Sequence, residues 1–188
     1  MDPAAVLSFW FGARDAASLH VRAEWFRKSD AFDADVRARF GGAIERALMR
    51  ELESWASTEE GALALIVLLD QFTRNAFRDT RRAFDGDPQA LEHARRLVYA
   101  GRDRAFAPIR RWFIYMPFEH SEDLVDQYES VRLFGVLADD GLPDPLSWAV
   151  RHFEVIRRFG RFPHRNEVLG RESTADELEF LQSPGSRF

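Results

Sequence analysis

The sequence contains no cysteine and a single lysine, Lys28, among its 188 residues. Without cysteine the chain can form no disulfide framework, thiol nucleophile, zinc finger or iron–sulfur cluster, which is consistent with a reducing cytoplasm. Long apolar runs are also missing, because the longest, Ala62 to Leu69, is far shorter than the ~18 residues of a membrane span. The segment after Met1 lacks the basic start and apolar stretch of a secretory signal. We therefore expect a cytoplasmic protein without a membrane partner.

An excess of positive charge is absent as well, since the formal net charge is -5. Nucleic-acid binding needs clustered cations that displace counterions from phosphates, so we expect no nucleic-acid partner. The sequence has no glycine-rich phosphate loop, no Gly-x-Ser-x-Gly elbow and no His-Glu-x-x-His pair. Its five histidines are scattered at positions 20, 93, 120, 152 and 164. These absences predict no cofactor and no metal site.

The chain is rich in apolar side chains that can form a core, with 46% hydrophobic residues, 17 Phe and 5 Trp. A chain of this length buries roughly 70% of its unfolded surface, which favours one domain over residues 1–188. Apolar residues recur at helical spacing almost throughout, so the sequence predicts an all-α protein. Short connections predict antiparallel helix hairpins, loosely similar to tetratricopeptide pairs. We expect residues 183–188 to be a disordered tail.

Capping residues and glycine stops place the expected helices along the chain. Ser29 can cap a helix whose apolar stripe continues to Leu52, and the Gly41-Gly42 pair inside it predicts close packing or a bend. Asp87 and Asp144, each followed by proline, are expected to cap two later helices. The predicted helices cover residues 3–11, a segment beginning near 19, and residues 30–52, 57–69, 87–100, 110–118, 121–138 and 144–159.

The first polar segment that can carry chemistry is Asp70 to Asn75. Asp70 and Arg74 lie four residues apart and so share one face of the predicted central helix, on which they emerge from an apolar stripe. One interpretation is an intrahelical ion pair that fixes the end of the helix. In the other, Arg74 and Asn75 are donors on the wall of a pocket, and Asp70 orients the guanidinium.

The second segment surrounds Glu119 and His120, directly after Pro117. Proline has no amide hydrogen to donate, so we expect it to kink the helix or start a new turn and to expose these two side chains. A Glu–His pair is suited to proton transfer. The alternative is that Glu119 pairs with an arginine while Glu122 and Asp123 favour a helix N-terminus.

The third segment, residues 151–171, holds six Arg and two Glu, so its net charge is positive although that of the whole chain is negative. Pro163 stiffens a short turn, and such turns position binding groups well. The alternative is that these arginines neutralise the acidic stretch from Glu119 to Glu129. His152 falls on the apolar arc of its helix, which is more typical of a core histidine. The polar side chains at the turn are Arg161, His164, Arg165 and Asn166.

Five motifs together resemble the bacterial domain-of-unknown-function family 924. They are Phe9-Trp10-Phe11-Gly12, Phe32-Asp33 with Arg37-x-Arg39-Phe40, Leu69-Asp70-Gln71-Phe72-x-Arg74-Asn75, Met116-Pro117-Phe118-Glu119-His120-Ser121-Glu122, and the run from Phe159 to Arg171. The resemblance covers nearly the whole chain, and the last two motifs are specific. It implies a bacterial protein with an all-α, right-handed tetratricopeptide-like array, and it implies no activity.

Three functional hypotheses follow, and none of them predicts an oligomeric state. The leading one is a binding module whose pocket takes a small anionic ligand or a carboxylate-bearing peptide. Its ligand-binding candidates are Asp70, Arg74, Asn75, Arg161, Arg165 and Asn166. The second is an enzyme with hydrolase-like acid–base chemistry, whose catalytic candidates are Glu119, His120 and His164. The third is a scaffold that docks protein partners. The first two predict that the three segments converge in one cavity, and the third predicts that they do not.

Overall fold

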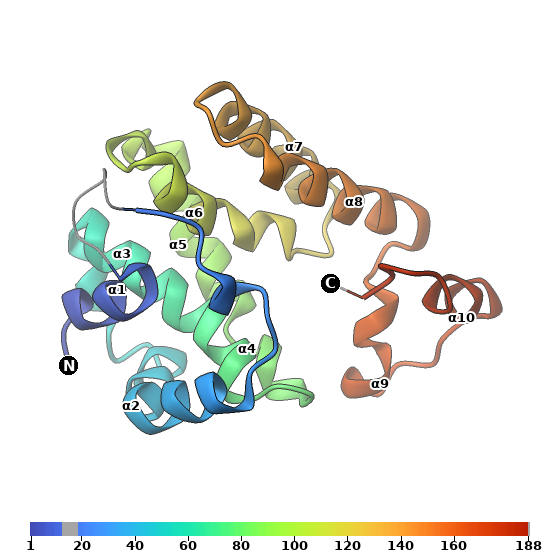
Figure 1. The fold of residues 1–188 in the computed structure, drawn as a ribbon, viewed down its shortest axis with the longest axis horizontal. Helices are drawn as coiled ribbons and strands as arrows, with labels where there is room; N and C mark the ends of the chain where they lie inside the picture. Colours follow the sequence, from blue (N-terminus) through green and yellow to red (C-terminus); the bar gives the residue numbers. More distant parts are fainter. Residues whose placement is uncertain (13–18, 188) are drawn as a thin grey trace.

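The computed structural model describes residues 1–12 and 19–187, which form helices and turns without a β-strand (Figure 1). The predicted all-α class is confirmed. The longer helices are α1 (Pro3–Phe11), α2 (Asp30–Leu48), α3 (Glu59–Ile66), α5 (Asp87–Tyr99), α6 (Pro108–Glu119), α7 (Leu124–Asp139), α8 (Asp144–Phe159) and α10 (Ala175–Leu181). The shorter elements are η2 (Ala23–Trp25), η3 (Glu53–Ser57), η4 (Val67–Phe72), α4 (Thr73–Ala76), η5 (Arg81–Phe84), η6 (Arg102–Ala105), η7 (Pro163–Arg165) and α9 (Asn166–Leu169).

Helix α3 lies at the centre of the fold, as its uniformly apolar sequence predicts. Thr58 caps the helix by accepting a hydrogen bond from the amide of Gly61, and every residue from Gly61 to Ile66 is buried. The helix packs against α1 on one side and α5 on another. It continues into η4, a turn of π-helix, and then into α4. This continuous helical segment supports the first polar segment.

Aromatic side chains join the N-terminal helix to the centre. The ring of Trp10 lies 5.5 Å from that of Phe72 and 5.4 Å from that of Phe113, both in edge-on geometry. The indole nitrogen of Trp25 donates a 3.0 Å hydrogen bond to the carbonyl of Trp10. These contacts hold η2 against α1. The helix predicted to begin near residue 19 is wrong, because residues 19–22 are not helical and only Ala23–Trp25 form a 3-10 turn.

The residues after α8 form a C-terminal lobe, residues 160–187, set apart from α1–α6 in Figure 1. Gly160 ends α8 with a φ of 68°, the left-handed conformation that the glycine stop predicts. An apolar cluster of Val155, Ile156 and Phe162, joined by Phe159 and Phe180, packs the lobe against the end of α8. In the expected tail, residues 183–187 are described and the carbonyl of Gly185 accepts a 2.8 Å hydrogen bond from Arg151, whereas residue 188 lies outside the described residues.

Several local expectations need correction. Pro117 lies inside α6, so it does not start a new turn, and Glu119 is buried rather than exposed. Asp87 and Asp144 are the first residues of their helices, and neither helix has a side-chain cap. Of the two outcomes predicted for the Gly41-Gly42 pair, close packing or a bend, close packing is wrong, because a Cβ at either glycine would meet nothing within 4 Å. Within the described ranges, no helix is long and apolar enough to cross a bilayer.

Candidate functional site

Asp70 lies in the π-helical turn η4 and is completely buried. Its carboxylate contacts three side chains: His120 Nδ1 at 2.7 Å from Oδ1, Arg74 Nη1 at 3.1 Å from Oδ1, and the amide nitrogen of Gln71 on Oδ2. A π-turn shifts the register of a helix and is frequent at functional sites. Here it presents both Asp70 and the neighbouring Gln71 to the end of α6, where Gln71 also contacts the sulfur of Met116 at 3.6 Å.

Asp70 belongs to a closed ring of contacts that we call the central cluster, composed of Asp70, Arg74, Asp87, Arg165 and His120. Arg74 binds Asp87 with two hydrogen bonds of 2.7 and 3.0 Å. Arg165 Nη1 lies 3.7 Å from Asp87 Oδ2 and donates a 3.1 Å hydrogen bond to the carbonyl of His120. The contact of His120 with Asp70 closes the ring. Five elements or their ends, namely η4, α4, α5, α6 and η7, therefore meet at one point.

Burial and charge set the protonation states of the cluster. Burial raises the pKa of Asp70, but the charge of Arg74 and the hydrogen bonds from His120 and Gln71 outweigh it and hold that pKa well below its usual range. Burial, followed by the charge of Arg74, lowers the pKa of His120, against the opposing effect of Asp70. Asp70 is therefore ionised at neutral pH and His120 is neutral.

Arg165 is held between two aromatic rings. Its guanidinium carbon lies 4.4 Å from the ring centre of Phe162 and 4.8 Å from that of Phe84. Its Nε is buried and has no hydrogen-bond partner within residues 1–12 and 19–187. Burial, together with the charge of Arg74, lowers the pKa of Arg165 to about 10, although Asp87 acts in the opposite direction. This cation is therefore less fully compensated than Arg74, whose pKa Asp70 and Asp87 raise against the effect of burial.

A second carboxylate–histidine pair lies beside the central cluster. His152 Nδ1 is 3.2 Å from Glu119 Oε1 and 2.9 Å from the carbonyl of Trp148, and the rings of His152 and His120 are 6.2 Å apart. His164 contacts Phe162 at 5.7 Å between ring centres. Burial, with the charges of Arg165 and His152 adding to it, lowers the pKa of His164 to about 3. Three histidines therefore gather around the cluster.

Arg161 and Asn166 lie in a different network inside the C-terminal lobe. Arg161 forms two hydrogen bonds of 2.6 and 2.7 Å with the buried carboxylate of Glu177. The amide of Asn166 donates to Ser173 at 3.0 Å and to Glu177 at 3.3 Å. Hydrogen bonds from Arg161 and from the Thr174 amide lower the pKa of Glu177 to about 2, against a smaller effect of burial. These two candidates stabilise the fold of the lobe and do not reach the central cluster.

Asn75 also lies outside the central cluster, although it follows Arg74 directly. Its side-chain amide donates a 2.8 Å hydrogen bond to Asp33 of α2, and Arg78 binds the same carboxylate at 2.6 and 2.9 Å. Asp33 is 3% exposed, so this is a buried polar joint between α2 and α4. The position of Asn75 is explained by this joint.

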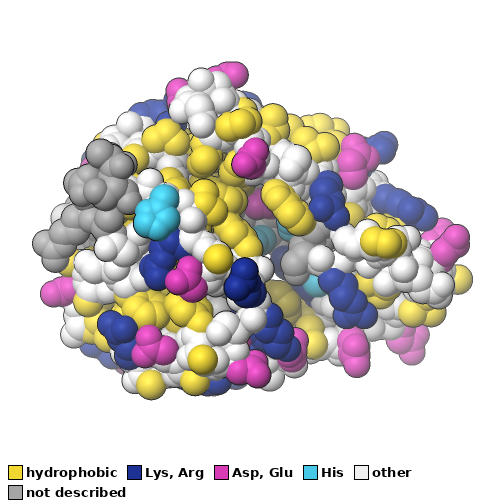
Figure 2. Space-filling model, viewed as in Figure 1, with side chains coloured by type: hydrophobic (Ala, Val, Ile, Leu, Met, Phe, Trp, Pro, Cys, Tyr) yellow, Lys and Arg dark blue, Asp and Glu magenta, His cyan; other side chains and the backbone are white. Residues whose placement is uncertain are grey.

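The central cluster lies where the C-terminal lobe meets the helices α4 to α6, because Arg165 comes from the lobe and its partners from the other side. Figure 2 shows this face hollowed between the two parts, with basic and histidine side chains visible in the depth. We call this hollow the cleft. The described part of the chain contains no group of three or more His, Asp or Glu side chains able to hold a metal ion.

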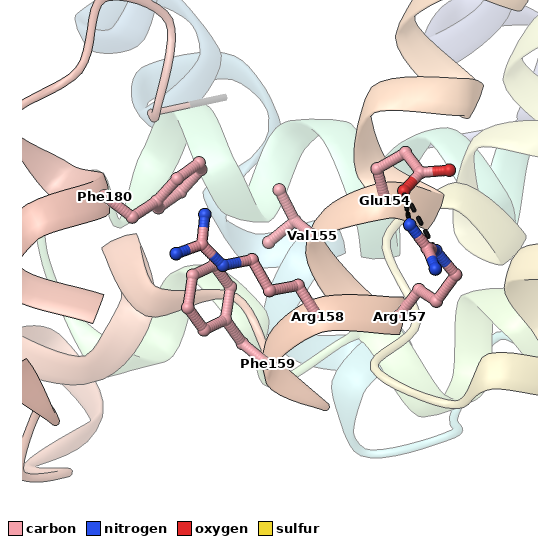
Figure 3. A pocket seen from close by; sticks show the side chains of 6 residues that line it. All are labelled: Glu154, Val155, Arg157, Arg158, Phe159 and Phe180. Carbon is pink, nitrogen blue, oxygen red and sulfur yellow. Dashed lines mark hydrogen bonds and ion pairs between the residues drawn. The ribbon is translucent and has the colours of Figure 1, made fainter. Parts of the chain in front are cut away.

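A second hollow of about 380 Å³ lies between α8 and α10 (Figure 3). Val155, Phe159 and Phe180 form its apolar surface. Arg157 at its edge pairs with Glu154 at 2.6 Å. None of the central-cluster residues lines it. The candidate site is therefore the cleft, where buried charged groups from distant segments converge.

Comparison with known proteins places the chain in a family. Residues 6–185 match the family described as bacterial protein of unknown function, DUF924. The chain belongs to this family. A solved protein of unknown function from Agrobacterium tumefaciens, ATU0120, is 39% identical to it, with a TM-score of 0.85 over 96% of each chain. No curated protein matches the chain. The resemblance inferred from the five motifs is confirmed, and the family match includes all residues of the central cluster and most of the lobe.

In this DUF924 chain, the structure thus brings together part of the predicted site. Four of the sequence candidates belong to the central cluster: Asp70, Arg74, His120 and Arg165. Two more, Glu119 and His164, lie beside it. Sequence reasoning missed Asp87, which it assigned to a helix cap, and Phe84, which no pattern marked. The structure thus brings parts of the three segments into contact, whereas Asn75, Arg161 and Asn166 lie in other networks.

Proposed function

We propose that this protein binds a small anionic molecule in the cleft, with Arg165 as the central contact. The observation that carries the proposal is the state of the Arg165 side chain. It is only 8% exposed, its Nη1 donates to a backbone carbonyl, and its nearest carboxylate oxygen lies at 3.7 Å. A buried guanidinium with incomplete partners is a favourable place for an anion, because a ligand oxygen supplies the missing compensation.

The surroundings of Arg165 support this function further. The rings of Phe84 and Phe162 hold the plane of the guanidinium, so less conformational entropy is lost when a ligand binds. The neutral state of His164, with its pKa of about 3, adds no competing positive charge at neutral pH. A carboxylate or a phosphate has the planar or forked oxygen geometry that a guanidinium recognises.

The test is a binding screen with acetate, succinate and inorganic phosphate, measured by thermal shift and calorimetry. We expect Arg165→Met to weaken binding by roughly 10- to 100-fold, the value of one charge-assisted hydrogen bond of about 1.5–3 kcal/mol. Arg157→Met is the matched control, because Arg157 pairs with Glu154 outside the cleft. Equal responses of the wild type and Arg165→Met to every anion would refute the proposal.

A second candidate function is acid–base catalysis, which the Asp70–His120 contact favours. An ionised aspartate can only accept a hydrogen bond, so the neutral imidazole donates from Nδ1 and keeps a lone pair on Nε2. That is the arrangement of a general base oriented by a carboxylate. We expect His120→Gln to lower hydrolysis of p-nitrophenyl acetate by roughly 100-fold. The same rate in the wild type and the variant would exclude this function.

A further inference from the structure

His120 offers a hydrogen-bond acceptor to the cleft. Its Nδ1 is engaged by Asp70 at 2.7 Å, and no residue of the described ranges forms a hydrogen bond with its Nε2. The side chain is 11% exposed, so the ring is not sealed off from solvent. With Nδ1 carrying the hydrogen, Nε2 is an acceptor. A ligand group that faces this nitrogen must therefore donate.

The same ligand also meets Arg165, which can only donate. Arg165 Nη1 contacts the carbonyl of His120 at 3.1 Å, so the guanidinium and this residue are adjacent. One small molecule that contacts both side chains therefore needs acceptor oxygens on one end and a donor beside them. A plain carboxylate satisfies Arg165 and leaves Nε2 without a partner.

The charges of the central cluster lead to the same requirement. Two cations, Arg74 and Arg165, stand against two carboxylates, Asp70 and Asp87, so the cluster is neutral before a ligand binds. Glu119 adds a further carboxylate nearby, 3.2 Å from His152. A ligand whose only polar group is an anion adds negative charge to a cluster that is already neutral. A ligand with an adjacent hydroxyl or ammonium group places its anion on Arg165 and its donor toward the acceptors.

We propose that the ligand is a 2-hydroxy- or 2-amino-carboxylate, with its carboxylate on Arg165 and its hydroxyl or ammonium group donating to His120 Nε2. This inference rests on the proposed binding function and narrows it to one chemical class. The carboxylate lies against the guanidinium, and the substituent on the neighbouring carbon reaches the imidazole. The half-buried ring of Phe84, whose centre lies 4.8 Å from the guanidinium carbon of Arg165, provides an apolar contact for the remainder of the molecule.

The test uses three probes that differ in one substituent: 3-phenylpropionate, 3-phenyllactate and phenylalanine. Calorimetry on the full-length wild type is expected to show roughly 3- to 10-fold tighter binding of the hydroxy or amino acid than of the unsubstituted acid, the value of one hydrogen bond. The comparison of phenyllactate with phenylalanine distinguishes the two sources of the donor. Equal affinities of all three overturn the inference, as does a lack of binding of all three while acetate or phosphate binds.

Variants separate this inference from the function on which it rests. His120→Leu is expected to remove the preference among the three probes, His120→Gln to keep it because the amide oxygen restores an acceptor, and Arg165→Met to weaken all three. If His120→Leu does not fold, the wild type and His120→Gln decide the question. A preference that persists in folded His120→Leu overturns the inference. No response of the wild type to any probe, acetate or phosphate instead refutes the proposed binding function.

Discussion

Gly86→Ala is the substitution whose effect the structure predicts most directly. A Cβ at Gly86 would lie 2.1 Å from the carbonyl oxygen of Leu69 and 2.8 Å from its carbonyl carbon. Both are backbone atoms of the π-turn that carries Asp70, so no side-chain rotation can relieve the contact. The φ of Gly86 is -87°, which any residue adopts. The cost is therefore steric, and it comes from the close approach of α5 to η4.

The size of the displacement sets the expected magnitude. The added carbon would be about 1 Å inside the 3.0 Å that marks the closest approach of real Cβ atoms, so α5 must move away from η4. Overpacking of this kind costs about 1–3 kcal/mol, which lowers the melting temperature of a chain of this length by about 2–12 °C. The shift also moves Asp87 away from Arg74, where the two hydrogen bonds now measure 2.7 and 3.0 Å.

The assay is thermal and urea unfolding of Gly86→Ala beside a matched control, Gly42→Ala. The control replaces a glycine inside α2 with nothing within 4 Å of the new Cβ, so it is expected to stabilise the protein by about 0.5–1 kcal/mol through helix propensity. The two alanines therefore act in opposite directions. Gly86→Ala within 0.5 kcal/mol of the wild type, roughly the scatter of neutral substitutions, would refute the close approach of the two elements.

Three further predictions concern the polar networks. The pKa of Glu177 is held at about 2 by Arg161, so this pair stabilises the fold above pH 4.5 and the contribution disappears as the pH falls toward about 2; Glu177→Gln should flatten that part of a urea-unfolding series. Burial lowers the pKa of His164 to about 3, so as the pH falls below about 6.5 the unfolded chain takes up a proton at this residue before the folded chain does. The free energy of unfolding therefore decreases by at most about 1.4 kcal/mol per pH unit below pH 6.5. The same pH dependence in a His164→Gln variant would contradict this. Asp33→Asn weakens the contacts with Arg78 and should cost about 1–3 kcal/mol in thermal unfolding, whereas an unchanged midpoint would show that the joint contributes nothing.

Capping residues and glycines correctly predicted helix ends that depend only on residues nearby in the sequence. Ser29 caps α2 as expected, since a hydroxyl that accepts an amide hydrogen bond requires only the next three residues. Gly12 and Gly160 end α1 and α8 in the left-handed conformation for an equally local reason. The uniformly apolar stretch of α3 likewise indicated its central position before any contact was known.

The other features depend on contacts between residues far apart in the sequence, and no local sequence pattern indicates these contacts. The same Asp-Pro pattern begins α5 and α8, yet only Asp87 lies near an arginine, because Gly86 lets α5 approach η4. The π-turn at Val67–Phe72 has no local signature, although it determines where Asp70 points. Pro117 shows the converse: its missing amide hydrogen is tolerated inside α6, so a residue that usually marks a break does not mark one here.

The separation of Arg161 from Arg165 illustrates the same limit within one turn. The two arginines are four residues apart and have identical chemistry, yet one binds Glu177 inside the lobe and the other crosses to His120. Both outcomes are long-range: Glu177 is 16 residues from Arg161 and His120 is 45 from Arg165. Charge density therefore singled out the segment but could not distinguish a structural arginine from a candidate ligand contact.

The C-terminal lobe packs on α8 through apolar side chains, but it contacts the segment after α6 and the start of α5 through polar groups, and these polar contacts connect ligand binding to the stability of the junction. Glu122 accepts a hydrogen bond from the amide of Phe162 at 2.8 Å and pairs with Arg171, and Arg165 contacts His120 and Asp87. A ligand that binds Arg165 only when the lobe is docked stabilises the docked state by mass action, by about 2.7 kcal/mol at 100 times its Kd. Ligand binding and docking of the lobe are then coupled, so a ligand should slow hydrogen exchange in the lobe as well as around His120.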